Sequence, residues 1–176
     1  MEDEQARTMK VLQLAVQMEV DGKEFYQKAS RKSSNKLAKE LFRQLANEED
    51  IHRKKFEELY KALKRGQNWP DVEPPFEKGK KIKSLFAEAS KALGTRFKIA
   101  ESELEAIKAA MDMEIRSYNL YHSRSAESTM PAEKQFYKNL AGEERGHHLA
   151  LLDSYEYLSD PTGWFTRKEH WSLDGA

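Results

Sequence analysis

Two residues whose side chains bind metal ions lie three positions apart in the segment LANEEDIH, residues 45–52. They are Glu49 and His52, and in a helix this spacing places both side chains on one face, one turn apart. Apolar residues continue the same face, with Leu45 before the pair and Phe56 after it. The face that this pattern predicts for the interior therefore carries a carboxylate and an imidazole, which need a charged partner or a metal ion once they are buried.

The sequence repeats itself after 95 residues without a gap. Apolar residues of the helical patterns coincide under this shift, together with three ligand-capable residues of each half. The matching pairs are Glu19 and Glu114, Glu49 and Glu144, and His52 and His147. A lone Glu-x-x-His in a chain with 34% charged residues is most often a solvated surface. Two copies with matched upstream glutamates instead indicate a duplicated site.

Four long amphipathic patterns predict helices at about residues 4–30, 34–65, 102–125 and 130–159. The expected end residues are Ser34 and Thr129 as N-caps of the second and fourth helices, Ser102 with Glu105 as a capping box of the third, and Gly66 at the end of the second. Residues 66–101 form a long crossover that contains a short amphipathic helix at about 82–93. The tail, residues 161–176, is aromatic and lacks a periodic pattern, so we expect it to lie across the bundle or a neighbouring subunit.

These elements predict an all-α fold, in which residues 1–160 form a pseudo-twofold antiparallel four-helix bundle with a long connection between its halves. Glu19 lies 14 residues before Ser33, and Glu49 lies 15 residues after Ser34. At the rise of an α-helix both paths measure about 21 to 23 Å, so the two glutamates reach the same level of neighbouring helices. The repeat requires the same of the second half. All six candidate ligands therefore converge on one layer of the interior.

Four carboxylates in one buried layer repel one another, and the same helical faces do not carry four Lys or Arg residues to compensate them. Two divalent cations would balance the charge, because the two neutral imidazoles add none. Carboxylate oxygen together with imidazole nitrogen suits iron or manganese. A Glu from each of two helices with Glu-x-x-His from each of the other two is the pattern of carboxylate-bridged di-iron bundles. The alternative is a metal-free bundle that keeps a hydrogen-bonded polar layer and acts as an interaction protein.

Three tyrosines follow the first glutamates of the two halves along the same helical faces. Tyr26 and Tyr121 come seven residues, about two turns, after Glu19 and Glu114, and Tyr118 comes one turn after Glu114. We expect their hydroxyl groups to hydrogen-bond the ligand carboxylates or to donate protons to a reaction. Buried tyrosines with ordinary partners would show the same spacing.

The whole chain has 176 residues, enough for one domain with a sizeable core. Thirty basic and thirty acidic side chains give a formal net charge of zero, so neither nucleic acid nor an anionic membrane is expected as a partner. Apolar runs stay well short of the roughly 20 residues that span a bilayer, and the polar start MEDEQARTMK differs from a signal peptide. The sequence contains no cysteine, which excludes disulfides and thiolate metal sites within it. We expect a soluble, cytoplasmic protein.

The sequence resembles the rubrerythrin family of the ferritin-like superfamily. The segments that carry the resemblance are AVQMEVDGKEFY at 15–26, LANEEDIH at 45–52, AAMDMEIRSYNLY at 109–121 and LAGEERGH at 140–147. The resemblance implies a ferritin-like bundle that binds two iron ions, with manganese as the alternative at one or both positions. The ligands that it implies are Glu19, Glu49, His52, Glu114, Glu144 and His147, of which Glu49 and Glu144 would bridge the ions.

Two departures from classical rubrerythrins shape the expected activity. The sequence lacks the cysteines of a rubredoxin domain, so we expect electrons from an external carrier such as a rubredoxin-type protein. Ser117 stands three residues after Glu114, where classical members have a second glutamate, so we expect a more symmetric centre. The resemblance implies an oxidoreductase of oxidative stress that reduces hydrogen peroxide or dioxygen. We also expect a homodimer, because such bundles commonly form oligomers and a second chain with swapped helices could complete the bundle. The alternative is a protein that binds or oxidises iron without peroxidase turnover.

Overall fold

The computed structural model describes residues 2–69 and 79–173, and the side chains of residues 5–69 and 79–168. Its elements are α1 (Glu2–Lys32), α2 (Lys36–Lys64), α3 (Lys80–Leu93), α4 (Glu101–Glu127), α5 (Pro131–Ser159) and α6 (Pro161–Leu173). Over these described ranges the regular structure is entirely helical, which confirms the predicted all-α class. The short helix expected in the crossover is α3.

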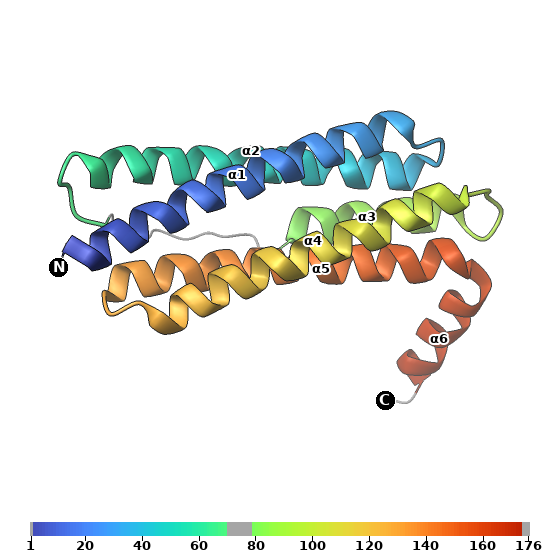
Figure 1. Ribbon diagram of the computed structural model, residues 1–176. Helices are drawn as coiled ribbons and strands as arrows, with labels where there is room; N and C mark the ends of the chain where they lie inside the picture. Colours follow the sequence, from blue (N-terminus) through green and yellow to red (C-terminus); the bar gives the residue numbers. More distant parts are fainter. Residues whose placement is uncertain (1, 70–78, 174–176) are drawn as a thin grey trace.

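Figure 1 shows two antiparallel helical hairpins that face each other, α1 with α2 and α4 with α5. The helices pack closely within each hairpin, whereas the two hairpins approach each other less closely. The crossover helix α3 packs against α2 and α5 in the part of the bundle where α4 begins. The arrangement is the ferritin-like four-helix bundle with one long connection. The wider spacing between hairpins leaves room for a layer of polar side chains.

The apolar core is divided into two clusters by this polar layer. On α2, Leu45 belongs to one cluster and Phe56 to the other. Glu49 and His52 occupy the buried stripe between them. Burying a Leu or Phe side chain contributes about 1.5–3 kcal/mol, so the two clusters together fix the level of the polar residues between them.

The start of α2 differs from the prediction. Asn35, and not Ser34, is the N-cap residue, and its side-chain oxygen accepts the N–H groups of Leu37 and Ala38 at 3.0 and 3.1 Å. Ser34 is engaged elsewhere, because its N–H and hydroxyl groups donate to the carboxylate of Glu103 at 2.8 and 3.0 Å. Glu103 lies on α4, 69 residues further along the chain, so local sequence spacing gives no sign of this contact.

The start of α4 is set by the same glutamate. The N–H of Ala100 donates to the Glu103 carboxylate at 3.1 Å, and the helix begins directly after Ala100. The capping box predicted for Ser102 and Glu105 is therefore wrong, and Glu103 closes the first turn instead. A single carboxylate thus joins the turn between α1 and α2 to the first turn of α4.

Gly66 ends α2 as predicted. Its φ of 76° lies in the left-handed region that glycine adopts without strain. The N–H of Gly66 donates to the carbonyl of Leu63 at 3.0 Å, and the N–H of Gln67 donates to that of Ala62 at 3.1 Å. These two bonds form a Schellman motif, which satisfies carbonyl groups that the helix end would otherwise leave without partners.

Proline opens each of the last two helices. α5 begins at Pro131 with Met130, and not the predicted Thr129, as its N-cap. α6 begins at Pro161, and the Asp160 carboxylate accepts a backbone N–H of its first turn at 3.0 Å. The tail is therefore helical over Pro161–Leu173, which corrects the expectation of a segment without periodic structure; residues 174–176 lie outside the described range. The sequence SDP ends α5, but Asp followed by Pro is also a helix start.

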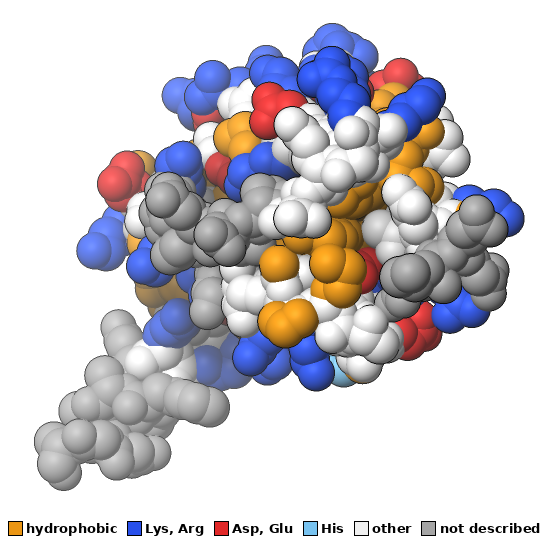
Figure 2. Space-filling view, turned by 90° about the vertical axis from the view of Figure 1, so that its left-hand side faces the viewer, with side chains coloured by type: hydrophobic (Ala, Val, Ile, Leu, Met, Phe, Trp, Pro, Cys, Tyr) orange, Lys and Arg blue, Asp and Glu red, His pale blue; other side chains and the backbone are white. Residues whose placement is uncertain are grey.

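The first turns of α6 pack on the bundle through Trp164. Its ring lies 5.5 Å from that of Phe86 on α3 and 5.3 Å from that of Tyr157 on α5, measured between centroids. Beyond this contact α6 turns away from the axis of α5 (Figure 1). Figure 2 shows the opposite end of the bundle, where hydrophobic side chains gather at the centre and Lys and Arg surround them. Among the described helices, none is both long and apolar enough to cross a membrane.

Candidate metal centre

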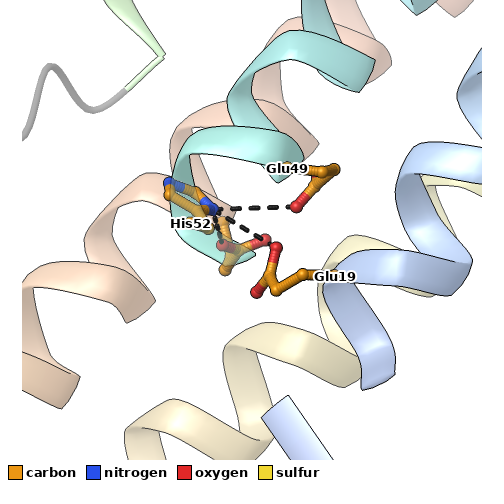
Figure 3. Close-up of side chains that lie close together, drawn as sticks. Glu19, Glu49 and His52 are labelled. Atoms are coloured by element: carbon orange, nitrogen blue, oxygen red, sulfur yellow. Dashed lines mark ion pairs between the residues drawn. The ribbon is translucent and has the colours of Figure 1, made fainter. Parts of the chain in front are cut away.

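The six candidate ligands all lie in the polar layer between the two apolar clusters. Figure 3 shows Glu19 of α1 pointing toward Glu49 and His52 of α2. The equivalent residues of α4 and α5 complete the layer. The exposed fractions are 2% for Glu19, 5% for Glu49, 2% for His52, 2% for Glu114, 1% for Glu144 and 0% for His147. The structure therefore brings together every residue that the sequence singled out as a ligand.

The ligand atoms form two overlapping groups, each compact enough to surround one ion. Within each group the candidate atoms lie within 4.8 Å of one another. The first group is Glu19, Glu49, His52 and Glu144, and the second is Glu49, Glu114, Glu144 and His147. Each group has its own glutamate and histidine, and both share Glu49 and Glu144. The donor set is therefore symmetric, as Ser117 in place of a further glutamate led us to expect.

Glu49 and Glu144 lie between the two histidines. Nδ1 of His52 is 3.3 Å from Glu144 Oε1, 3.7 Å from Glu49 Oε2 and 3.5 Å from Glu19 Oε2. Nδ1 of His147 is 4.0 Å from the other oxygen of each shared glutamate. Each shared carboxylate thus directs one of its oxygens toward His52 and the other toward His147, which is the orientation that a bridging carboxylate needs.

Several polar atoms of this layer have no hydrogen-bond partner among the described residues. They are Glu19 Oε2, His52 Nδ1, Glu114 Oε2, Glu144 Oε1 and both ring nitrogens of His147. Buried polar groups are nearly always bonded, so such a concentration requires an explanation. Metal–ligand bonds of about 2.1 Å place neighbouring ligand atoms about 3 to 4 Å apart, which is the spacing found here. Oxygen and nitrogen donors in this arrangement fit divalent iron or manganese.

The pKa values of the four carboxylates shift in opposite directions, because burial and mutual repulsion raise two of them whereas contacts with neighbouring side chains lower the other two. Burial and the negative charge of Glu19 raise the pKa of Glu49 well above its ordinary value, and burial with the charge of Glu114 does the same to the pKa of Glu144. Burial also acts to raise the pKa of Glu19, but contacts with Glu49 and His52 outweigh it and leave that pKa lowered. Without cations, the two shared carboxylates therefore hold protons that metal binding would displace.

The pKa values of His52 and Glu114 also result from burial and from contacts that oppose it. Burial by itself lowers the pKa of His52, but the carboxylates of Glu19 and Glu49 outweigh it and hold that pKa well above its usual range. For Glu114, burial acts to raise the pKa, whereas the neighbouring His147 and Glu144 lower it, and the lowering prevails. In the absence of metal, protons therefore compensate part of the negative charge of the layer, and two cations would replace them.

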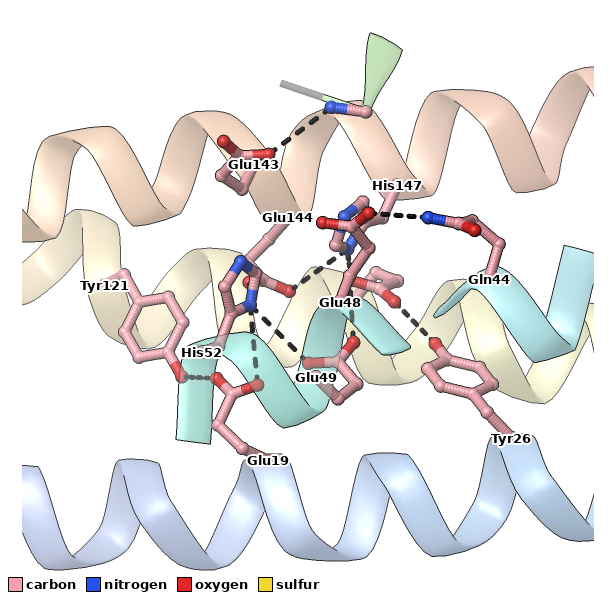
Figure 4. Close-up of polar contacts among 12 residues, drawn as sticks. Glu19, Tyr26, Gln44, Glu48, Glu49, His52, Tyr121, Glu143, Glu144 and His147 are labelled. Atoms are coloured by element: carbon pink, nitrogen blue, oxygen red, sulfur yellow. Dashed lines mark hydrogen bonds and ion pairs between the residues drawn. The ribbon is translucent and has the colours of Figure 1, made fainter. Parts of the chain in front are cut away.

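Two of the three predicted tyrosines bond carboxylates of the candidate ligands, and each reaches across to the other half. Tyr26 of α1 donates to Glu114 Oε1 at 2.5 Å, and Tyr121 of α4 donates to Glu19 Oε1 (Figure 4). Burial, with the nearby carboxylate charges, raises the pKa of both phenols well above the ordinary value. Both hydroxyl groups therefore keep their protons and orient one oxygen of each carboxylate, leaving the other directed into the layer.

Tyr118 does not reach the candidate ligands, which corrects the expectation for this residue. Its half-buried ring packs against the apolar cluster around Leu12 and stacks on the ring of His122 with centroids 5.4 Å apart.

Sequence reasoning missed the residues that cover the second half of the centre. Glu143 is buried and accepts the N–H of Gly79 at 3.4 Å (Figure 4). Gly79 approaches α5 so closely that a Cβ on it would lie 2.8 Å from the carbonyl carbon of Gly146. The sequence does contain a sign of this close approach. Gly146 is a glycine inside a predicted helix, and the repeat aligns it with the much larger Ile51.

A bundle with one Glu on each of two helices and Glu-x-x-His on each of the other two has the architecture of carboxylate di-metal proteins. A family model, Rubrerythrin, matches residues 10–155 of the sequence. The match covers most of the chain, which therefore belongs to the rubrerythrin family. Comparison with curated proteins and with solved structures gave no significant match.

Proposed function

We propose that the protein binds two iron ions in the buried layer and uses them to reduce hydrogen peroxide or dioxygen. One ion would lie among Glu19, Glu49, His52 and Glu144, and the other among Glu49, Glu114, Glu144 and His147, with manganese as the alternative at either position. The observation that carries the proposal is the pair of overlapping donor groups, in which six buried nitrogen and oxygen atoms have no hydrogen-bond partner among the described residues. Membership of the rubrerythrin family supports the same assignment.

The chain's own residues would hold, orient and shield the site. Two bound ferrous ions supply one electron each to the oxidant and balance four carboxylate charges. Glu49 and Glu144 present an oxygen to either side and would fix the separation of the two positions. Tyr26 and Tyr121 hold the outer glutamates through hydrogen bonds, which maintains their orientation. The two apolar clusters above and below exclude bulk water from the layer.

Electrons for repeated turnover would come from an external carrier, such as a rubredoxin-type protein, because the sequence has no cysteines to hold an iron–sulfur site. This role in oxidative stress would make the protein a non-haem peroxidase or oxidase. The homodimer and the cytoplasmic location expected from the sequence stay predictions.

Rapid mixing of the ferrous protein with hydrogen peroxide and, separately, with dioxygen tests the activity. Fast oxidation by peroxide, followed by repeated cycles in the presence of a reduced rubredoxin-type carrier, is the expected result. Slow oxidation that leaves iron behind as a mineral would contradict peroxidase turnover and favour an iron-binding or iron-oxidising role.

A neighbouring glutamate provides a matched control for this experiment. Glu49→Gln removes a shared ligand, and we expect it to abolish the fast phase. Glu48→Gln changes the adjacent residue, which accepts a hydrogen bond from Gln44 at 2.7 Å outside the ligand groups, and we expect it to react as the unmodified protein does. Equal rates in the two variants would contradict the assignment of the site.

A further inference from the structure

We propose that Trp69, Tyr137 and Tyr121 form an electron path between one end of the bundle and the metal centre. The path rests on the proposed function, because it delivers electrons to the same site. The hydroxyl of Tyr121 donates to Glu19. The rings of Tyr121 and Tyr137 stack with centroids 6.3 Å apart and planes 24° apart, and the centroid of Tyr137 is 6.0 Å from that of Trp69. Three rings that give up an electron more readily than phenyl or aliphatic groups therefore follow one another from the site outward.

The other half of the bundle lacks this path, although the repeat places aromatic residues at the same three positions. The aligned pairs are Tyr121 with Tyr26, Tyr137 with Phe42, and Trp69 with Trp164. Phe42 stacks on Tyr26 with centroids 6.1 Å apart, but a phenyl ring is hard to oxidise. The ring of Trp164 contacts rings of α3, α5 and α6, none of them Phe42. The molecule therefore contains its own control for the path.

Trp69 can exchange electrons with a donor outside the bundle. It borders a surface cavity of about 460 Å³, whose wall also includes Met9, Leu63 and Met130. The cavity lies at the end of the bundle that faces the viewer in Figure 2. A second chain of rings joins Tyr121 to Trp69 through Phe56 and Phe136, with centroids 5.5–5.7 Å apart, but it consists of phenyl rings. Tyr137 is thus the one phenol between the two ends among the described ring contacts.

The surroundings of Tyr137 suit a ring that passes an electron on and keeps its proton. Its hydroxyl is buried and has no hydrogen-bond partner among the described residues, so its proton has no acceptor. The guanidinium carbon of Arg124 lies 5.8 Å from the ring, and Arg124 is itself paired with Glu133 at 2.8 Å. Arg124 also pairs with the exposed Glu127 at 3.3 Å, so its positive charge beside the ring is compensated. Tyr137 therefore acts as a bridge, and the charge rests on Tyr121 or Trp69.

The electrons and protons of the step balance. Reduction of hydrogen peroxide to two water molecules takes two electrons, which the outside donor supplies in turnover, and two protons, which are taken up from solvent. When Tyr121 gives an electron to the site, its phenolic proton moves along the existing hydrogen bond to Glu19 Oε1. An electron from Trp69 then reaches Tyr121 through Tyr137, and the proton returns. A one-electron donor outside restores Trp69; without a donor, two such losses and one water molecule convert its indole to hydroxyindole and release two protons.

The experiment maps tryptophan oxidation in the iron-loaded full chain after excess hydrogen peroxide without any donor. Trp69 and Trp164 are equally exposed, each at 8%, so direct attack from solvent would modify both alike. We expect peptide mass spectrometry to find the added oxygen on Trp69 and not on Trp164, and on neither residue in the metal-free protein treated in the same way. Comparable modification of both residues, or none at Trp69, overturns the path.

Tyr137→Phe is the decisive variant, because it gives this half the residue that the other half already has at Phe42. The change removes a hydroxyl without partners, so the fold and the iron content should be preserved. We expect the oxygen on Trp69 to be lost and the tyrosyl radical signal in electron paramagnetic resonance to persist on Tyr121. Undiminished modification of Trp69, with iron bound and oxidised as before, overturns the path and leaves the proposed function intact. Failure to bind iron at all overturns both.

Discussion

The two halves of the bundle hold the same candidate ligands but are covered differently. In the second half the crossover residue Gly79 lies directly on Gly146 of α5 and bonds the buried Glu143. The repeat aligns Gly146 with Ile51, which is 40% exposed, and Glu143 with Glu48, which is only half-buried. Duplication therefore accounts for the symmetric ligand layer. The crossover, which occurs once, makes the surroundings of the two halves unequal.

The largest expected effect separates shared from unshared ligands. Glu144→Ala removes an oxygen donor from both groups, so we expect loss of both ions. His52→Ala and His147→Ala each disturb one group, so we expect each variant to keep about one of its two ions. Elemental analysis after gel filtration measures the content. Retention of both ions by Glu144→Ala would refute the bridging assignment.

The next effect, on the free energy of unfolding, tests the close contact between the crossover and α5, which only the second half has. Gly79→Ala places a Cβ against the backbone of Gly146 at a φ of 68°, so we expect the free energy of unfolding to fall by about 2 to 5 kcal/mol. Gly66→Ala is the matched control, because Gly66 has a similar φ of 76° but open space around it, and it should cost about 1 to 2 kcal/mol. Chemical denaturation compares them. Equal losses would show that the close approach of the crossover does not matter.

A smaller effect, on metal affinity, tests the hydrogen bonds that Tyr26 and Tyr121 donate to glutamates of the opposite half. Tyr26→Phe frees Glu114 and Tyr121→Phe frees Glu19, so each should weaken metal binding about 10- to 100-fold, in the half opposite to the mutated tyrosine. Ferrous titration against a competing chelator measures both affinities. Tyr118→Phe serves as the control, since Tyr118 stacks on His122 outside the layer. A loss of affinity in the control equal to that of the other two would contradict the account.

The smallest expected effect is the change in the free energy of unfolding for each unit of pH. Above pH 4.5 an unfolded glutamate is ionised, whereas Glu49 and Glu144 in the metal-free fold keep their protons because burial and repulsion raise their pKa values. The raised pKa of His52 acts in the same direction above 6.5. The folded state then binds more protons than the unfolded state, so its stability falls as pH rises, by about 1.4 kcal/mol per pH unit for each such group.

Metal should reverse this dependence, because cations take the place of the protons and bind more tightly as pH rises. Denaturation curves of the metal-free and iron-loaded protein at several pH values between 5 and 8 check the sign. A metal-free protein that gains stability across this range would contradict the charge argument.

The sequence was sufficient for the ligands because two independent constraints agree there. Helical spacing places Glu49 and His52 on one apolar face, and the repeat supplies an identical set at Glu144 and His147. The fold follows from the same facts, since two hairpins with matching buried faces can cover those faces by pairing; the sequence left open whether the partner hairpin belongs to the same chain or to a second one. Both the ligands and the fold could be predicted from spacing along the chain, without knowledge of contacts between residues on different helices.

The errors arose where such contacts decide the outcome. Ser34 carries a good capping side chain, but Glu103 of another helix bonds it, and Asn35 caps α2 instead. Tyr26 does bond a carboxylate as expected, but the spacing could not say which one: it lies about 10 Å along α1 from Glu19 and bonds Glu114 across the layer. Tyr118, chosen by the same spacing argument, has no such partner. Tertiary packing, and not local pattern, selects among side chains of equal propensity.

The central claim is that a buried ring of four carboxylates and two histidines is neutralised by paired metal ions. Its most direct test is the iron content of the full chain after anaerobic loading and gel filtration, followed by an optical spectrum after oxidation. The account predicts two iron ions per chain and the near-ultraviolet absorption of an oxo-bridged ferric pair. Less than one iron per chain, with the fold intact, would contradict it.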